Sequence, residues 1–184
     1  MKAVFLRTCT LFLAASLAAC STTSGGDSAG GTEVTTTHLG QQIARGPIAV
    51  EAFDQADANS PEFGNYASSV AQQLTRLGWT VVAAPARSEQ VALVDVQQGS
   101  RASLASRIGV PSGGAAAGAS ASLATSLDVR IRRRSDGSVI WEGRAISDGP
   151  VNNPAAGRPA TVQALAAALF RDFPGVSGRT IRSR

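Results

Sequence analysis

Residues 123–145 read LATSLDVRIRRRSDGSVIWEGRA, and this stretch decides the fold. Apolar and charged residues alternate along its first half, which is the period-two pattern of a half-buried strand. One face carries Leu127, Val129 and Ile131, and the other carries Asp128, Arg130 and Arg132. Ser135, Asp136 and Gly137 then form a turn sequence with Gly available for the left-handed position. The stretch therefore predicts a β-hairpin.

A three-residue loop from Ser135 to Gly137 sets one register for this hairpin. That register pairs Arg133 with Val139, Ile131 with Trp141, Val129 with Gly143, Leu127 with Ala145, Arg130 with Glu142, and Asp128 with Arg144. Apolar residues then oppose apolar residues and opposite charges face each other. A two-residue loop would place Ile131 opposite Glu142. We predict the first register, with its ion pairs on a solvated face.

The rest of the chain predicts a mostly antiparallel sheet and two helices. Ser60 and Pro61 begin a helix whose apolar stripe ends before Gly78. A second helix is predicted from Ala160 to Phe170, with a buried stripe that continues to Phe173. Further strands are predicted at residues 34–39, 48–53, 79–83 and 91–96, with a short edge strand at 179–182. The fold class is α+β, a two-layer sandwich with both helices on one face.

Residues 98–120 are rich in Gly, Ala and Ser, and they predict a long loop. The stretch contains neither a GxxxxGK[ST] nor a GxGxxG sequence, so it is not a phosphate-binding loop. It remains a candidate binding element.

The N-terminal segment has the layout of a secretory signal peptide. Lys2 and Arg7 precede a short apolar run, which then ends in Leu17-Ala18-Ala19-Cys20. A membrane-spanning helix would need about 20 apolar residues. The last four residues match the bacterial lipobox, so the sequence predicts cleavage before Cys20 and attachment of S-diacylglycerol and an N-acyl chain such as palmitate to that residue. Ordinary secretion with cleavage after Ala19 is the alternative.

Three segments follow from this prediction. Residues 1–19 form the signal peptide, residues 20–33 form the lipidated Cys20 and a flexible Gly/Ser-rich tether, and residues 34–184 form one α+β domain. Position 21 is Ser rather than Asp, and in enteric bacteria an Asp there marks retention in the inner membrane. We therefore expect an anchor in the outer membrane, facing the periplasm.

The charge balance is close to neutral once the signal peptide is removed. Without Lys2 and Arg7, the chain keeps 15 Arg, no Lys and 13 acidic residues, a net charge of +2. Together with the export signal, this argues against nucleic acid as a partner. Two interpretations apply to Arg130, Arg132 and Arg134. The favoured one is a solvated, partly neutralised strand face, and the alternative is a site for an anionic partner or phospholipid.

Catalytic and metal-binding motifs are absent from the sequence. Beyond Cys20 no cysteine remains, so disulfides and Cys-based metal sites are excluded. His38 is the only histidine, and we expect a satisfied surface residue there rather than a catalytic base. Asp95 is expected on a solvent face or sheet edge. No Gly-x-Ser-x-Gly sequence occurs. The sequence therefore predicts no catalytic residues, no metal and no cofactor.

Several short motifs together resemble a bacterial lipoprotein family known as domain of unknown function 4136. They are Ile48-Ala49-Val50, Ser60-Pro61-Glu62-Phe63, Tyr66-Ala67, residues 127–131, Asp136-Gly137, residues 140–145, residues 168–175 and Gly178-Arg179-Thr180. The resemblance covers nearly all of residues 34–182. It implies an envelope lipoprotein, and the family has no established activity from which catalytic residues could be carried over.

The function expected from these observations is a lipid-anchored, non-enzymatic binding or assembly module of the periplasm. Its partners would be the membrane, through the anchor, and an envelope protein. Two alternatives are an auxiliary lipoprotein of a transport or cell-wall complex, and a hydrolase with a site that the sequence does not reveal.

Overall fold

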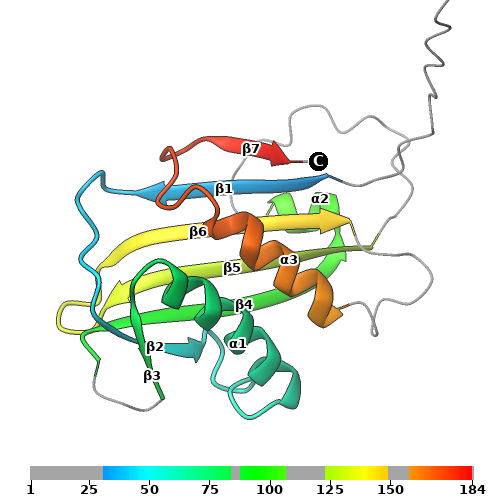
Figure 1. Ribbon diagram of the computed structural model, residues 1–184. Helices are drawn as coiled ribbons and strands as arrows, with labels where there is room; N and C mark the ends of the chain where they lie inside the picture. The colour runs from blue at the N-terminus through cyan, green and yellow to red at the C-terminus, as the bar shows by residue number, and fades with distance from the viewer. Residues whose placement is uncertain (1–30, 84–87, 107–122, 149–157, 184) are drawn as a thin grey trace, which may run out of the picture.

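The computed structural model describes residues 31–83, 88–106, 123–148 and 158–183 (Figure 1). Its helices and strands are β1 (Thr32–His38), β2 (Pro47–Ala52), α1 (Pro61–Arg76), β3 (Thr80–Val82), β4 (Gln90–Ser100), α2 (Arg101–Ser106), β5 (Leu123–Arg133), β6 (Val139–Asp148), α3 (Arg158–Phe170) and β7 (Thr180–Ser183). Every strand and both helices expected from the sequence are present. Within the described ranges, no helix is both long and apolar enough to cross a membrane.

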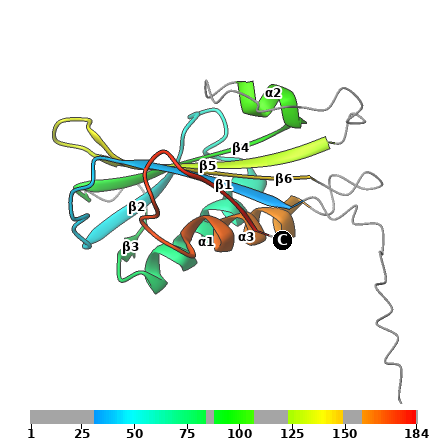
Figure 2. The same cartoon turned by 90° about the horizontal axis from the view of Figure 1, so that it is seen from above.

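One sheet of seven strands unites these elements, in the order β3-β2-β4-β5-β6-β1-β7. Strand β2 pairs in parallel with β3 and β4, and all other pairs are antiparallel. Helices α1 and α3 cover one face of the sheet, and the short helix α2 lies on the opposite face (Figure 2). The predicted α+β sandwich, with a mostly antiparallel sheet and two helices on one face, is confirmed.

The β5–β6 hairpin has the predicted register over most of its length. Ile131 pairs with Trp141, Val129 with Gly143, Leu127 with Ala145, Arg130 with Glu142, and Asp128 with Arg144. The prediction was wrong at the turn, where Val139 pairs with Arg132 instead of Arg133. Trp141 pairs with Ile131, and Val139 pairs with the next residue of β5, Arg132. Ile140 between them therefore has no partner on β5 and forms a β-bulge.

Helix α1 has the end signals that its sequence predicts. The Ser60 hydroxyl accepts a hydrogen bond from the Phe63 amide at 3.1 Å, which satisfies one of the free donors of the first turn. Pro61 occupies the first helical position. At the other end Gly78 has φ +96°, and the amide of Trp79 donates to the carbonyl of Leu74 at 3.0 Å.

Trp141 lies at the centre of the core, between the sheet and helix α3. Its indole is fully buried and stacks on Phe170, with ring centroids 5.3 Å apart. The ring of Phe173 packs against the same indole, with ring centroids 5.1 Å apart. The indole N–H donates to the carbonyl of Pro174 at 3.0 Å, so this buried donor is satisfied. A Cβ atom added at Gly143 would lie 2.3 Å from the indole ring, so only glycine fits beside it.

The prediction of one long loop at 98–120 was wrong for its first part. Strand β4 continues to Ser100, and residues 101–106 form α2; residues 107–122 lie outside the described residues. The expected tether also ends earlier, because β1 begins at Thr32. Helix α2 buries Leu104 against Ala124 and Ile146 on the face that was expected to be solvated.

This cover corrects the prediction for Asp128. Asp128 is only 5% exposed, although it was expected in an exposed ion pair. The partner is as predicted, because Nε of Arg144 donates to Oδ1 of Asp128. Arg144 also donates to the carbonyl of Leu104 in α2 at 3.2 Å. The short helix therefore turns one cross-strand pair into a buried one.

Candidate functional site

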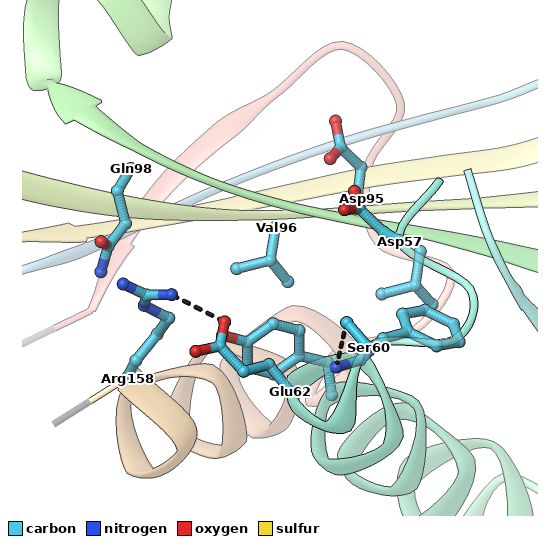
Figure 3. Close-up of a pocket in the computed structure, with 10 residues that line it drawn as sticks. Asp57, Ser60, Glu62, Asp95, Val96, Gln98 and Arg158 are labelled. Atoms are coloured by element: carbon cyan, nitrogen blue, oxygen red, sulfur yellow. Dashed lines mark hydrogen bonds and ion pairs between the residues drawn. The ribbon is translucent and has the colours of Figure 1, made fainter. Parts of the chain in front are cut away.

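A cavity of about 250 Å³ opens at the amino-terminal end of α1 (Figure 3). It lies between the first turn of that helix, the loop before it, the second half of β4 and the first residue of α3. Its lining residues are Asp57, Ser60, Glu62, Phe63, Tyr66, Val94, Asp95, Val96, Gln98 and Arg158.

The unequal lengths of two neighbouring strands create this space. Strand β2 ends at Ala52, opposite Val94, and the amide of Phe53 makes a last bond to the Val94 carbonyl at 2.9 Å. Strand β4 then runs on to Ser100, paired with β5 all the way. Beyond Val94, the side of β4 that β2 occupied is bordered by the cavity.

Three interacting side chains form the wall on the helix side. Nη1 of Arg158 donates to Oε2 of Glu62 at 2.8 Å, as Figure 3 shows. The Tyr66 hydroxyl donates to the same Glu62 oxygen, at 3.5 Å. Burial raises the pKa of Tyr66, and the Arg158 hydrogen bond opposes that shift. Tyr66 and Glu62 in turn raise the pKa of Arg158, so its guanidinium keeps its charge.

Carboxylates outnumber guanidinium groups among the charged side chains that line the cavity. Asp57 and Glu62 line it, against the single guanidinium of Arg158; Asp95 borders the cavity, but its carboxylate points to the opposite face of the sheet. Glu62 is paired with that guanidinium, and Oδ2 of Asp95 accepts a hydrogen bond from Gln97 at 2.6 Å. Asp57 forms no ion pair within the described part of the chain. The cavity therefore suits a ligand that brings hydrogen-bond donors or positive charge.

The predicted arginine face lies on the opposite side of the sheet from this cavity. Arg130 donates to Glu142 at 2.9 Å and lies over the ring of Phe53, 4.8 Å from its centroid. Arg134 is paired with Glu51. Arg132 has a buried Nε without a hydrogen-bond partner in the described structure. The first interpretation, a partly neutralised strand face, describes Arg130 and Arg134; the three are not gathered into one pocket.

Two further candidates have defined places. Nδ1 of His38 accepts from the Gly40 amide at 3.0 Å, so Nε2 carries the proton and donates to the Gly175 carbonyl at 3.1 Å. His38 thus joins the end of β1 to the turn before β7. Asp95 lies on β4, one residue beyond the last pair with β2, and its carboxylate points to the face of the sheet opposite the helices, beside Arg130 and Arg144. Cys20, the predicted lipid attachment site, lies outside the described residues, and so does the signal peptide.

Sequence reasoning missed the group of Glu62, Tyr66 and Arg158. Glu62 and Tyr66 are four residues apart on α1, and this spacing places them on one helix face. Arg158 begins another helix, 96 residues later in the chain, and no local pattern connects it to them. Among the described residues, no three His, Cys, Asp or Glu side chains are grouped so that they could hold a metal ion.

Similarity to a solved structure with a TM-score above 0.5 supports the fold. No family model matches the chain. An uncharacterised protein of Zymomonas mobilis is 25% identical over 207 aligned positions, covering 80% of this chain and 78% of that protein. A PDZ domain protein from Parabacteroides distasonis matches with a TM-score of 0.53 and 12% identity, over 84% of this chain and 39% of that one. A PelC dodecamer from Paraburkholderia phytofirmans has a TM-score of 0.46 and 16% identity, over 76% and 94% of the two chains.

Proposed function

We propose that this chain is a lipid-anchored lipoprotein of the bacterial outer membrane that faces the periplasm and binds an envelope protein without catalysing a reaction. The observation that carries the proposal is the lipobox, Leu17 to Cys20, after a short basic and apolar leader. Diacylglycerol and an N-acyl chain on Cys20 supply more than one hydrocarbon chain, which is what durable anchoring requires. The resemblance to family 4136 supports the same proposal.

The position of the cavity relative to the anchor supports a partner near the membrane. Nη2 of Arg101 in α2 donates to the Gly31 carbonyl at 3.2 Å, and Nη1 pairs with Glu33 at 3.2 Å. The described chain therefore starts beside α2, at the end of the sheet where β4 finishes (Figure 1). The second half of β4 also lines the cavity. The Gly/Ser-rich sequence after Cys20 predicts a tether, which at its length would reach about 20 Å. This reach would hold the cavity close to the membrane surface.

The character of the cavity supports binding rather than catalysis. Tyr66, Glu62 and Arg158 hold one another, and a catalytic acid or base would need to reach a substrate proton. His38 uses both ring nitrogens in the link between β1 and the turn at Gly175. An auxiliary role in a transport or cell-wall complex is one setting in which such a binding module would work.

Site-specific crosslinking in intact cells tests the proposal. A photoreactive amino acid replaces Asp57 at the cavity in the full-length lipoprotein. A matched variant carries it at Asp136, on the hairpin turn at the other end of the sheet (Figure 1). We expect a discrete envelope protein to crosslink from position 57 and not from position 136. Equal products from both positions would contradict a specific site, and substrate turnover by the purified protein would contradict the non-enzymatic role.

A further inference from the structure

Strand β4 changes from an internal strand to an open edge along its length. The carbonyl of Val94 accepts the last hydrogen bond from the β2 side, from Phe53. Backbone N–H and C=O groups of alternate residues point to the same side of a strand. Those of Val96 and Gln98 therefore point to the side that β2 has left. In the described part of the chain, none of these four groups has a partner.

This edge is short and bounded at both ends. The loop after Ala52 closes one end, where Phe53 makes its bond to Val94. At the other end, the Ser103 amide donates to the Ser100 hydroxyl at 3.2 Å. The Ser103 hydroxyl donates to the Ser100 carbonyl at 2.9 Å. The open part of β4 thus spans Val96 to Gln98. Its length is sufficient for pairing with the backbone of a short extended segment.

The same edge is part of the cavity wall. Val96 and Gln98 line the cavity, and in Figure 3 their side chains point from β4 toward the helices. A strand added here would lie in line with β2 and pass through the cavity. Its backbone would pair with β4, and its side chains on the helix side would meet the carboxylate of Asp57.

Charge complementarity selects the kind of segment that would fit. Residues 46–75 contain four acidic residues and no Lys, Arg or His, in a chain whose net charge is positive. Asp57 lies beside the open edge and forms no ion pair in the described structure, whereas the Asp95 carboxylate points to the opposite face of the sheet, beside Asp128, Arg130 and Arg144. A basic segment would therefore be attracted to this edge.

We propose that the open edge of β4 at Val96 and Gln98 takes up an extended, basic segment of the envelope protein partner and adds it to the sheet as a strand. This inference rests on the proposed function and names how its partner is bound. The backbone groups of the edge supply affinity, and the unpaired carboxylate of Asp57 supplies the preference for Lys or Arg. Open strand edges take up extended peptides in this way in many binding domains.

Direct binding of a defined peptide tests this inference. The probe is fluorescent acetyl-Lys-Val-Lys-Val-Lys-amide, added to the full-length lipidated protein in detergent micelles, with a Glu-for-Lys peptide as the charge control. Gln98→Pro removes one edge N–H, on the side where no ladder bond is lost, and the matched Gln98→Ala keeps it. We expect binding of the basic peptide only, about tenfold weaker in Gln98→Pro and within about twofold of wild type in Gln98→Ala.

A second measurement keeps the test decisive if Gln98→Pro fails to fold. Amide hydrogen exchange of the wild-type protein should slow at Val96 and Gln98 when the basic peptide is added, and should stay unchanged on the outer strand β7. Equal binding of the two peptides, or no slowing at these two amides, would overturn the inference. So would self-association through this edge that Gln98→Pro abolishes, because the occupant would then be a second copy. If the peptide does not bind but Cys20 is lipidated, the strand-addition inference fails and the proposal of a lipid-anchored protein stands. The two outcomes are therefore distinguishable.

Discussion

Arg158 Nη1 donates to Glu62 Oε2 across 2.8 Å and so joins the first residue of α3 to the first turn of α1. The two helices cover the same face of the sheet, and this ion pair closes the gap between them at the cavity. Tyr66 adds its hydroxyl to the same carboxylate. The pair therefore shapes the cavity wall and sets the environment of Tyr66.

The titration of Tyr66 should report on that wall, because it is the only tyrosine in the chain. Burial raises its pKa above the usual 10.0, and Arg158 lowers it. Arg158→Met keeps most of the side-chain volume and removes the charge, so we expect the pKa of Tyr66 to rise further. The measurement is the near-ultraviolet absorbance of tyrosinate against pH. A pKa that falls in Arg158→Met would contradict the described contact, and Arg171→Met, outside the cavity, should leave it unchanged.

Loss of Arg144 should destabilise the protein more than loss of any exposed arginine. Burial is the main cause that raises the pKa of Asp128, and Arg144 opposes it. Arg144→Met leaves a buried carboxylate unpaired, which costs about 3–5 kcal/mol of unfolding free energy. Oδ2 of Asp128 already lacks a hydrogen-bond partner in the described structure, so the carboxylate has little other support.

The pH dependence of that loss has a definite sign. The pKa of Asp128 is higher in the folded than in the unfolded protein, so ionisation of this group lowers stability as pH rises through the folded-state pKa. Arg144→Met raises that pKa further. Urea unfolding should therefore show a larger deficit for Arg144→Met at neutral pH than at mildly acid pH. A deficit that is equal at both pH values would count against a buried, ionised Asp128.

Gly143→Ala should strain the core at Trp141. The added Cβ would lie 2.3 Å from the indole ring and 2.8 Å from Cδ1 of Leu169, so the ring or α3 must shift. Overpacking of this kind costs about 1–3 kcal/mol of unfolding free energy. Gly64→Ala is the matched control, because nothing lies within 4 Å of its new Cβ. At this exposed position of α1 it should stabilise by roughly 0.5–1 kcal/mol. Thermal unfolding of both variants checks the prediction, which an undisturbed Gly143→Ala would contradict.

His38→Ala should affect stability and leave partner binding intact. The variant loses the bonds to Gly40 and Gly175, and we expect a cost of about 1–2 kcal/mol in unfolding free energy. Thr37→Ala, at the neighbouring exposed position, should change it by less than about 0.5 kcal/mol. Denaturant unfolding and the crosslinking assay measure the two effects. Loss of crosslinking in a folded His38→Ala protein would show that this histidine has a functional role.

The parts of the fold that follow local rules were predictable from the sequence. The alternation around Val129 and the turn at Gly137 predicted the hairpin register, and Ser60 and Gly78 predicted both ends of α1. The bulge at Ile140 was not predictable, because one extra residue next to a turn leaves the alternation of the remaining strand unchanged.

The candidate site depends on contacts that the sequence pattern does not contain. The cavity exists because β4 extends further than β2. Which strand pairs with which, and how far each extends beyond its partner, depends on the whole sheet. Helix α2 has only six residues, too few for a periodic apolar pattern, so its cover over Asp128 could not be read beforehand. Arg158 reaches Glu62 only in the folded protein.

The central claim is that Cys20 carries the lipid that anchors this protein. Mass spectrometry of the N-terminal peptide from membrane-extracted protein tests it most directly, with Cys20→Ser as the control. We expect the wild-type peptide to begin at Cys20 with diacylglycerol and an N-acyl chain, and the control to keep an uncleaved leader without lipid. A wild-type peptide that begins at Cys20 without lipid, or one that still carries residues 1–19, would contradict the account.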